Sequence, residues 1–541
     1  MGKAKRMAGV LLASAGMAAL AGCVAQRTGT ETETADVIST VPLATAGATV
    51  ANRASQPPAP TAVAPAERYA EFTAGSFVAT ADQAYSTFAA DVDTVAYARI
   101  RRFIAEGALP PAEVVRIEEL VNYFPYDYPV PADRYHPIAV STELAPAPWS
   151  ERTSILRVGI QGFHEDTVLR PPLNLVFLVD VSGSMDAPDR LPLLQRGLAE
   201  LVATLRPVDR VALVTYAGGV ETVLEPTPGD RQDEIRDAVL GLRPGGSTNG
   251  AGGLETAYDL AAASYDPKAV NRVILVTDGD FNVGVSSPDA IGDVAAARRD
   301  LGVYITVLGV GTDNLNDAIM QAIAQRGDGI AAYVDGEEEM RRALGDSTAH
   351  TLFPIADDVK IQVSFNPALV AEYRLLGYET RAITREQFYD DAADGGDVSA
   401  GHSVTAIYEI VPGLSIASGT AAPRVEPVSY APAEAWRADG LAQVEVRYQR
   451  PRSDQVEQIV AQVTQADELV RLEQAGADTR FAAAVAGFAQ LLRGDPYLKA
   501  FGYDDVVALA QAARGDDPFG YRAEFVQLVR LSDTAQEAAA Q

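Results

Sequence analysis

The stretch Leu173–Ser184 reads LNLVFLVDVSGS, an unbroken apolar run that ends in three oxygen-bearing side chains, Asp180, Ser182 and Ser184. A run this apolar is typical of a strand covered on both faces, as in a parallel sheet between two layers of helices. Open sheets of this kind bind their ligands at the carboxyl ends of the strands. A carboxylate beside two hydroxyls offers oxygen ligands of the kind that Mg²⁺ prefers. The stretch therefore predicts an α/β fold with a cation site at one edge of the sheet.

Strands and helices alternate through the centre of the chain, from Pro172 to about Leu344. This alternation predicts a doubly wound, mostly parallel sheet. The strand candidates are Leu173–Val179, Arg210–Tyr216, Val220–Leu224, Arg272–Thr277, Val303–Val310 and Ala331–Val334. The helix candidates are Leu191–Leu205, Asp230–Leu242, Gly250–Ser264, Pro288–Leu301, Leu315–Gln325 and Glu337–Leu344.

The flanking segments have other patterns, which predict a small N-terminal α+β module and a C-terminal module that is β-rich and then helical. On the N-terminal side we expect helices over 94–106 and 114–124, followed by strands within 136–162. On the C-terminal side we expect strands over 359–365, 402–410 and 441–449, followed by helical stretches over 456–492 and 504–531.

The start of the chain has the pattern of a secretory signal. Basic residues at 3–6 precede an apolar, Ala-rich stretch over 7–20, which is too short to be a stable transmembrane helix. Its end, Leu20-Ala21-Gly22-Cys23, resembles a bacterial lipobox, in which the signal is cut just before a cysteine that becomes lipid-modified. Cys23 is the only cysteine of the chain, so no disulfide can form within it. An ordinary signal peptide with an incidental cysteine is the alternative.

The lipobox resemblance implies a cell-envelope protein anchored by lipid at Cys23. By the sorting rule of such lipoproteins, Val24 in place of aspartate favours the outer membrane if the cell is Gram-negative, with the folded part facing the periplasm or the surface. The next residues are rich in Thr, Ala, Pro and Ser, which is typical of a disordered tether.

The composition excludes some classes of partner. Lys and Arg total 44 against 73 Asp and Glu, so the net charge is −29, which argues against nucleic acid because phosphate binding needs a basic surface. The same charge argues against binding flat on an anionic membrane.

We expect a signal peptide over 1–22, a tether over 23–67, the N-terminal module over 68–165, the α/β domain over 166–350 and the C-terminal module over 351–541.

Two further segments carry polar groups to the same expected edge of the sheet. Gly245–Asn249 (GGSTN) forms a Gly-rich loop before a helix, and Asp278 follows the strand candidate Arg272–Thr277. Together with the DxSxS sequence at 180–184, this pattern resembles a von Willebrand factor type A (VWA) domain with a complete metal-ion-dependent adhesion site (MIDAS). On that resemblance, Asp180, Ser182, Ser184, Thr248 and Asp278 are the metal-site residues.

The VWA resemblance implies a mode of binding. In that family the serines coordinate Mg²⁺, Mn²⁺ or Ca²⁺ directly, the threonine does so in the high-affinity state, and the aspartates often act through water. A glutamate or aspartate of a partner protein commonly completes the coordination. A site with few direct charged ligands leaves the cation electrophilic towards an incoming carboxylate.

The flanks extend the resemblance over nearly all of the expected mature chain. The sequences Ser86-Thr87-Phe88, Val115–Phe124 and Leu376-Gly377-Tyr378-Glu379 resemble bacterial VWA-domain lipoproteins of the YfbK type. The implied function is binding of an envelope or extracellular protein partner, without catalysis.

Catalytic motifs are absent from the sequence. The four histidines lack zinc-site spacing, and there is no GxSxG motif and no phosphate-binding GK[ST] loop. Two alternatives stay open: a metal-assisted hydrolase of the envelope, which would use the same cation to activate water, and a purely structural envelope protein.

Overall fold

The structure is a computed structural model. It describes residues 75–90, 93–133, 135–163, 170–246, 251–279, 288–299, 301–311, 329–344, 354–391, 395–413, 439–451 and 455–539, with positions 320, 323, 324, 326, 327, 393 and 453. The predicted signal peptide, the tether, Cys23 and Thr248 lie outside these residues, as does most of the helix predicted over Leu315–Gln325. Within the described part, no helix is both long and apolar enough to cross a membrane.

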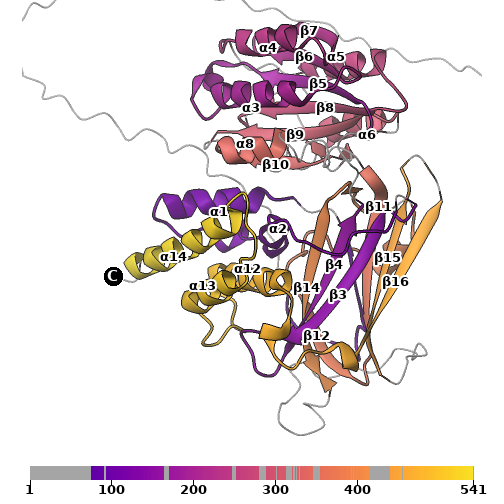
Figure 1. The fold of residues 1–541 in the computed structure, drawn as a ribbon, viewed down its shortest axis with the longest axis vertical. Coiled ribbons are helices and arrows are strands. Elements are labelled where there is room, and N and C mark those ends of the chain that lie inside the picture. Colours follow the sequence, from indigo (N-terminus) through magenta and orange to yellow (C-terminus); the bar gives the residue numbers. More distant parts are fainter. Residues whose placement is uncertain are drawn as a thin grey trace, which may run out of the picture. The chain divides into compact units, whose positions relative to one another are not determined.

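The centre of the chain forms the predicted α/β fold (Figure 1). Its six strands follow the order β10-β9-β8-β5-β6-β7, and all neighbours are parallel except the pair β6 and β7. The strands are β5 (Leu173–Asp180), β6 (Arg210–Tyr216), β7 (Val220–Pro228), β8 (Val270–Thr277), β9 (Tyr304–Val310) and β10 (Ala331–Val334). The sequence-based fold class is confirmed.

Helices cover both faces of this sheet, because its strands are apolar on both sides. Every residue of β5 is buried. Its alternate residues Leu175 and Phe177 pack in one core with α3 (Leu191–Thr204), α4 (Gln232–Gly241) and α8 (Glu337–Leu344). Val176 and Leu178 pack in the opposite core with α5 (Ala251–Ala263) and α6 (Pro288–Arg299). The two cores hold β5 rigidly, so the position where its chain leaves the sheet is fixed.

The segments before and after the α/β region share two further sheets, although the sequence analysis treats them as separate modules. One sheet has the order β1-β12-β14-β4-β3, and in the other β2 joins the path β13-β11-β15-β16 through β11. Strands β4 and β14 pair along eight residues, and β2 pairs with β11. Pairing between strands so far apart in sequence leaves no local signal, which is why periodicity did not reveal it.

The inner faces of these two sheets form one hydrophobic core. The strands from the first segment are β1 (Val78–Ala79), β2 (Tyr85–Ala89), β3 (Ile138–Pro146) and β4 (Ser154–Gly162). Those from the second are β11 (Pro354–Phe365), β12 (Val370–Leu375), β13 (Val398–Ser399), β14 (Ser403–Pro412), β15 (Gly440–Gln449) and β16 (Val456–Thr464). Because both segments supply the core, we expect neither set of strands to fold without the other.

The helical prediction for 456–492 is wrong at its start. Residues 456–464 form strand β16, and helix α12 begins only at Ala477. The sequence VEQIVAQVT alternates exposed and partly buried residues over most of its length, which suits an edge strand with one face to solvent. The stretch 504–531 is interrupted as well, since α13 (Tyr503–Ala512) and α14 (Tyr521–Ala539) are separated by a turn in which Gly515 and Gly520 adopt positive φ angles.

Apart from the short helix α10 (Arg385–Tyr389), the helices outside the α/β region share a core of their own. They are α1 (Val95–Ala105), α2 (Ile117–Asn122), α12 (Ala477–Arg493), α13 and α14, with a short 3₁₀ turn, η1, at Ala112–Val114. The rings of Phe124, Phe481 and Phe525 meet edge to face within this core, with centroids 5.0 to 5.5 Å apart. Aromatic pairs of this geometry add to the stability that burial alone provides.

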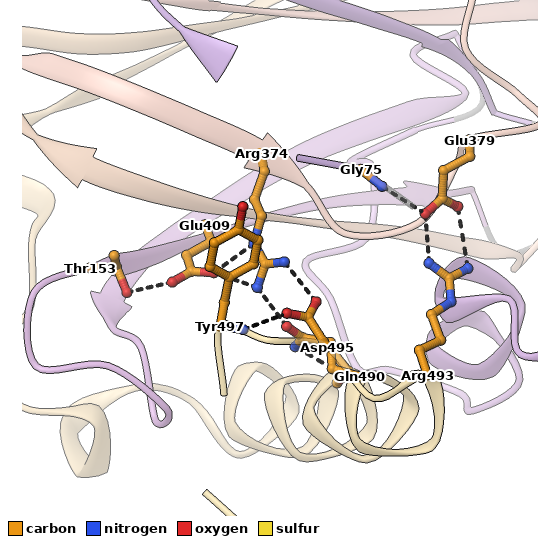
Figure 2. A network of polar contacts seen from close by, with 10 residues as sticks. Gly75, Thr153, Arg374, Glu379, Glu409, Gln490, Arg493, Asp495 and Tyr497 are labelled. Atoms are coloured by element: carbon orange, nitrogen blue, oxygen red, sulfur yellow. Dashed lines mark hydrogen bonds and ion pairs between the residues drawn. The ribbon is translucent and has the colours of Figure 1, made fainter. Parts of the chain in front are cut away.

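Arg374 joins this helical layer to the strands (Figure 2). From β12, its guanidinium donates to Glu409 of β14 (2.8 Å) and, beyond the sheet, to Gln490 of α12 (2.7 Å) and Asp495 (2.7 Å). The ring of Tyr497 lies 4.5 Å from the guanidinium carbon. Arg374 is almost fully buried, and its charge is stabilised because these acceptors surround it.

Glu118 of α2 is a second buried ionisable group, and it is not surrounded by hydrogen-bond partners in the way that Arg374 is. Burial, together with the neighbouring carboxylates of Glu379 and Glu119, raises its pKa from 4.5 to about 7 against the opposing effect of Arg493. Its Oε2 atom is buried without a hydrogen-bond partner among the described residues. The folded protein therefore favours the protonated form of Glu118 below about pH 7.

This shift predicts a pH-dependent contribution to stability. The pKa of Glu118 is higher in the folded chain than in the unfolded one, so protonation of Glu118 stabilises the folded state. This stabilisation is complete below about pH 4.5 and is lost as the pH rises to about 7. Glu118→Gln imitates the protonated form, so its free energy of unfolding relative to wild type should rise by about 2 kcal/mol between pH 5 and pH 8. Denaturant titrations at the two pH values measure this.

The matched control is Glu113→Gln, which changes an exposed carboxylate of the preceding η1 turn. Its stability relative to wild type should be the same at both pH values. If the difference in free energy of unfolding between Glu118→Gln and wild type does not change with pH, the assignment of a raised pKa to Glu118 is contradicted.

Candidate metal centre

The candidate site lies where two neighbouring parallel strands end. In the pairing of β5 with β8, Val179 is opposite Val276, so Asp180 and Asp278 leave the sheet at the same edge. Both aspartates are buried, with 0% and 3% of their surface exposed. Two carboxylates are thus held at the carboxyl edge of the sheet, as the sequence analysis expected.

The DxSxS loop folds back on Asp180. The backbone N–H of Ser182 donates to Asp180 Oδ1 at 2.7 Å. A short 3₁₀ turn, η2 (Gly183–Asp186), then brings the next serine round, so that the hydroxyl oxygens of Ser182 and Ser184 lie 3.0 Å apart. The loop therefore presents two hydroxyls side by side next to a buried carboxylate.

Backbone contacts fix this loop against its neighbours. The N–H of Val181 donates to the carbonyl of Tyr216 (3.0 Å) at the end of β6. The N–H of Gly245 donates to the carbonyl of Val181 (2.7 Å), and the N–H of Gly183 donates to the carbonyl of Gly246 (3.3 Å). The start of the Gly-rich loop thus contacts the serine loop directly. Thr248, the remaining predicted ligand, lies outside the described residues.

The two aspartates have unsatisfied oxygens. Asp180 Oδ2 and Asp278 Oδ1 are both buried without a hydrogen-bond partner in the described part of the chain. An unsatisfied buried acceptor destabilises a fold by about 1–3 kcal/mol. Burial, with a smaller effect from the charge of Asp278, raises the pKa of Asp180 to about 6. A divalent cation would satisfy these oxygens and offset the clustered negative charge.

The donor set therefore fits a hard cation. Carboxylate and hydroxyl oxygens are the ligands that Mg²⁺, Mn²⁺ and Ca²⁺ take, whereas Zn²⁺ sites are built mainly from nitrogen and sulfur. Across the described residues, no cluster of three or more His, Cys, Asp or Glu side chains forms a metal-binding group. The candidate site combines two aspartates with hydroxyls instead, and its small negative charge is in keeping with a cation that also needs a ligand from elsewhere.

The sequence analysis missed two residues at this edge. Arg190, at the start of α3, donates from Nη1 to Asp278 Oδ2 (2.7 Å) and to the carbonyl of Ser184 (2.8 Å). Tyr216 is opposite Asp180 in the pairing of β5 with β6, and burial, with a smaller effect from the charge of Asp180, raises the pKa of its phenol. The strand alternation could have indicated Tyr216 as the last residue of the strand beside β5. No sequence signal indicated Arg190.

Comparison with known proteins agrees with this architecture. The family description "von Willebrand factor type A domain" matches residues 174–345, and "Uncharacterized protein YfbK, C-terminal" matches residues 350–535. Protein YfbK of Escherichia coli K12 is 39% identical over 476 residues, which cover 86% of this chain and 81% of that protein. The chain belongs to the YfbK family of VWA-domain proteins.

Other proteins are less similar to this YfbK-family chain. Human inter-alpha-trypsin inhibitor heavy chain H3 is 27% identical over 182 residues, which cover 31% of this chain and 20% of that protein. The solved von Willebrand factor type A structure from Catenulispora acidiphila is 16% identical, with a TM-score of 0.40, and the match covers 73% of this chain and 89% of that one. The VWA domain is a module that often mediates protein interactions and is generally not an enzyme.

Proposed function

We propose that this chain is a lipid-anchored cell-envelope protein whose VWA domain binds a protein partner through a divalent cation. The observation that carries the proposal is the pair of adjacent hydroxyls, Ser182 and Ser184, beside two buried carboxylates with unsatisfied oxygens. Bound there, the cation would supply an electrophilic position for a carboxylate of the partner.

Each residue has a proposed role. Ser182 and Ser184, with Thr248 from the Gly-rich loop, would hold the cation directly through their hydroxyl oxygens. Asp180 would hold it directly or through water, while its Oδ1 keeps the N–H of Ser182 in place. Asp278 would act from the neighbouring strand through its unsatisfied Oδ1. Mg²⁺ is the proposed ion, with Mn²⁺ or Ca²⁺ as chemically similar substitutes.

The cation site is tested by direct binding of Mn²⁺, which substitutes for Mg²⁺ and can be followed by electron paramagnetic resonance. Wild-type protein should bind one Mn²⁺, and excess Mg²⁺ should displace it. Asp180→Asn and Ser182→Ala should each weaken binding by at least tenfold, because each removes a proposed ligand oxygen or its charge.

The matched control for Mn²⁺ binding is Asp186→Asn, since Asp186 is an exposed carboxylate of the same loop. It should change the affinity less than threefold. A wild-type chain that binds no Mn²⁺, or variants that all bind equally, would contradict the proposed site.

The partner is proposed to be an envelope or extracellular protein that offers an acidic side chain. A partner captured from envelope fractions by the wild-type chain in Mg²⁺ should be released by EDTA, and Asp180→Asn should not capture it. Asp186→Asn should capture it normally. Capture that persists in EDTA would argue against a cation-mediated contact.

The anchor is proposed to be a lipid on Cys23, which is the only cysteine in the chain. In a bacterial host, wild-type protein should incorporate labelled palmitate and sediment with membranes, whereas Cys23→Ser should do neither. Val24→Ala, which leaves Cys23 in place, is the control and should still be labelled. Labelling of Cys23→Ser would contradict the assignment.

A further inference from the structure

Arg190 provides the one positive charge that directly contacts the candidate metal centre among the described residues. The same nitrogen, Nη1, donates to the carboxylate of Asp278 (2.7 Å) and to the carbonyl of Ser184 (2.8 Å). The side chain is largely buried, with 12% of its surface exposed. The guanidinium thus bridges the two segments, from β5 and from β8, that build the site.

We propose that Arg190 sets the charge balance of the metal centre: it lowers the intrinsic affinity for the cation and raises the affinity of the loaded site for a carboxylate ligand. The proposal rests on the function proposed above. It adds a specificity-determining residue to that site, outside the five positions that the DxSxS pattern, the Gly-rich loop and Asp278 supply.

The structure holds Arg190 in place on two sides. It begins helix α3, where its carbonyl accepts from the N–H of Leu194 (2.9 Å). Its aliphatic stem packs against Gly311, just after β9, where an added Cβ would lie 2.6 Å from Arg190 Nε and 3.0 Å from Cγ. Gly311 also has a positive φ of 93°, which favours glycine. Because a side chain at position 311 would displace the guanidinium, the narrow space there keeps the charge beside Asp278.

The charge count at the site explains the proposed effect. Asp180 and Asp278 contribute −2, and Arg190 contributes +1, so these three side chains sum to −1. A bound divalent cation brings the sum to +1. Without Arg190 the sums would be −2 before binding and 0 after it. The arginine therefore repels the incoming cation, yet it leaves the loaded site positive and attractive to a carboxylate.

The hydrogen bond also acts on Asp278 itself. One of its oxygens, Oδ2, is engaged by Arg190, so only Oδ1 stays available. A carboxylate held in this way is a weaker ligand than a free one, because part of its negative charge is already compensated. Fewer direct anionic ligands leave more of the cation's charge for the partner's carboxylate.

A purely structural role for Arg190 predicts the opposite result. Its bond to the Ser184 carbonyl helps to fix the serine loop, so a loss of order there would weaken cation binding. The charge-balance role predicts that removal of the guanidinium strengthens cation binding. The sign of the change therefore distinguishes the two roles.

The test uses Mn²⁺ as the cation and acetate as the carboxylate, on the full chain in about 0.15 M salt. The Mn²⁺ affinity is measured by electron paramagnetic resonance, and acetate binding by the loss of water-proton relaxation enhancement as acetate displaces water from bound Mn²⁺. Arg190→Met should bind Mn²⁺ at least threefold more tightly than wild type and should need at least threefold more acetate for half-displacement. Arg190→Lys, which keeps the charge, should lie closer to wild type on both measurements.

The matched control is Arg196→Met, since Arg196 is an exposed cation of the same helix that pairs with Glu337. It should leave both measurements within twofold of wild type. If Arg190→Met binds Mn²⁺ no more tightly than wild type, or binds acetate equally well, the inference is overturned while the cation site stands. If wild type itself binds no Mn²⁺, the proposed function fails first.

Discussion

The parallel pairing of β5 with β8 is the constraint on which the rest of the site depends. Both strands are buried along their whole length, so helices on the two faces fix where each strand ends. Asp180 is the last residue of β5 and Asp278 follows the end of β8, and both side chains are still excluded from water. Buried carboxylates need hydrogen bonds or an opposite charge, and here each has one oxygen that no group in the described part of the chain satisfies. The packing of an apolar sheet has thus created a polar edge that a cation would complete.

Other features of the fold determine how that edge is completed. The serine loop is held by backbone bonds from β6 and the Gly-rich loop, so its hydroxyls need no large movement to face the same point. Arg190 adds a positive charge from a third direction and is kept in place by the absence of a side chain at Gly311. The arginine partly neutralises the two aspartates, so these side chains alone would not fully compensate a divalent cation. Such a site is suited to a cation whose coordination is completed by a ligand from another molecule. This is the physical reason to expect binding of a partner at this edge.

The sequence could predict the α/β part well because most of its parallel strands are apolar runs that alternate with amphipathic helices. The run at 173–180 and the strand at 210–216 lie where their composition indicates. Prediction from the sequence failed where the decisive contacts join residues that are distant in sequence. Residues 456–464 fit a helical or a strand pattern, and only pairing with β15 selects the strand. For the same reason the shared sheets of the flanking segments, and the approach of Arg190 to Asp278, could not be predicted. Both arise from packing between elements rather than from any local motif.

The central claim is that a divalent cation binds between the DxSxS loop and Asp278, and an experimental structure with Mn²⁺ tests it most directly. Crystals of the chain soaked in Mn²⁺ should show an anomalous difference peak within about 2.0–2.3 Å of the Ser182 and Ser184 hydroxyl oxygens, with Asp180 and Asp278 around it. The hydroxyl of Thr248 should reach the same ion. A map without a peak at this position, or with Mn²⁺ bound only elsewhere on the chain, would contradict the account.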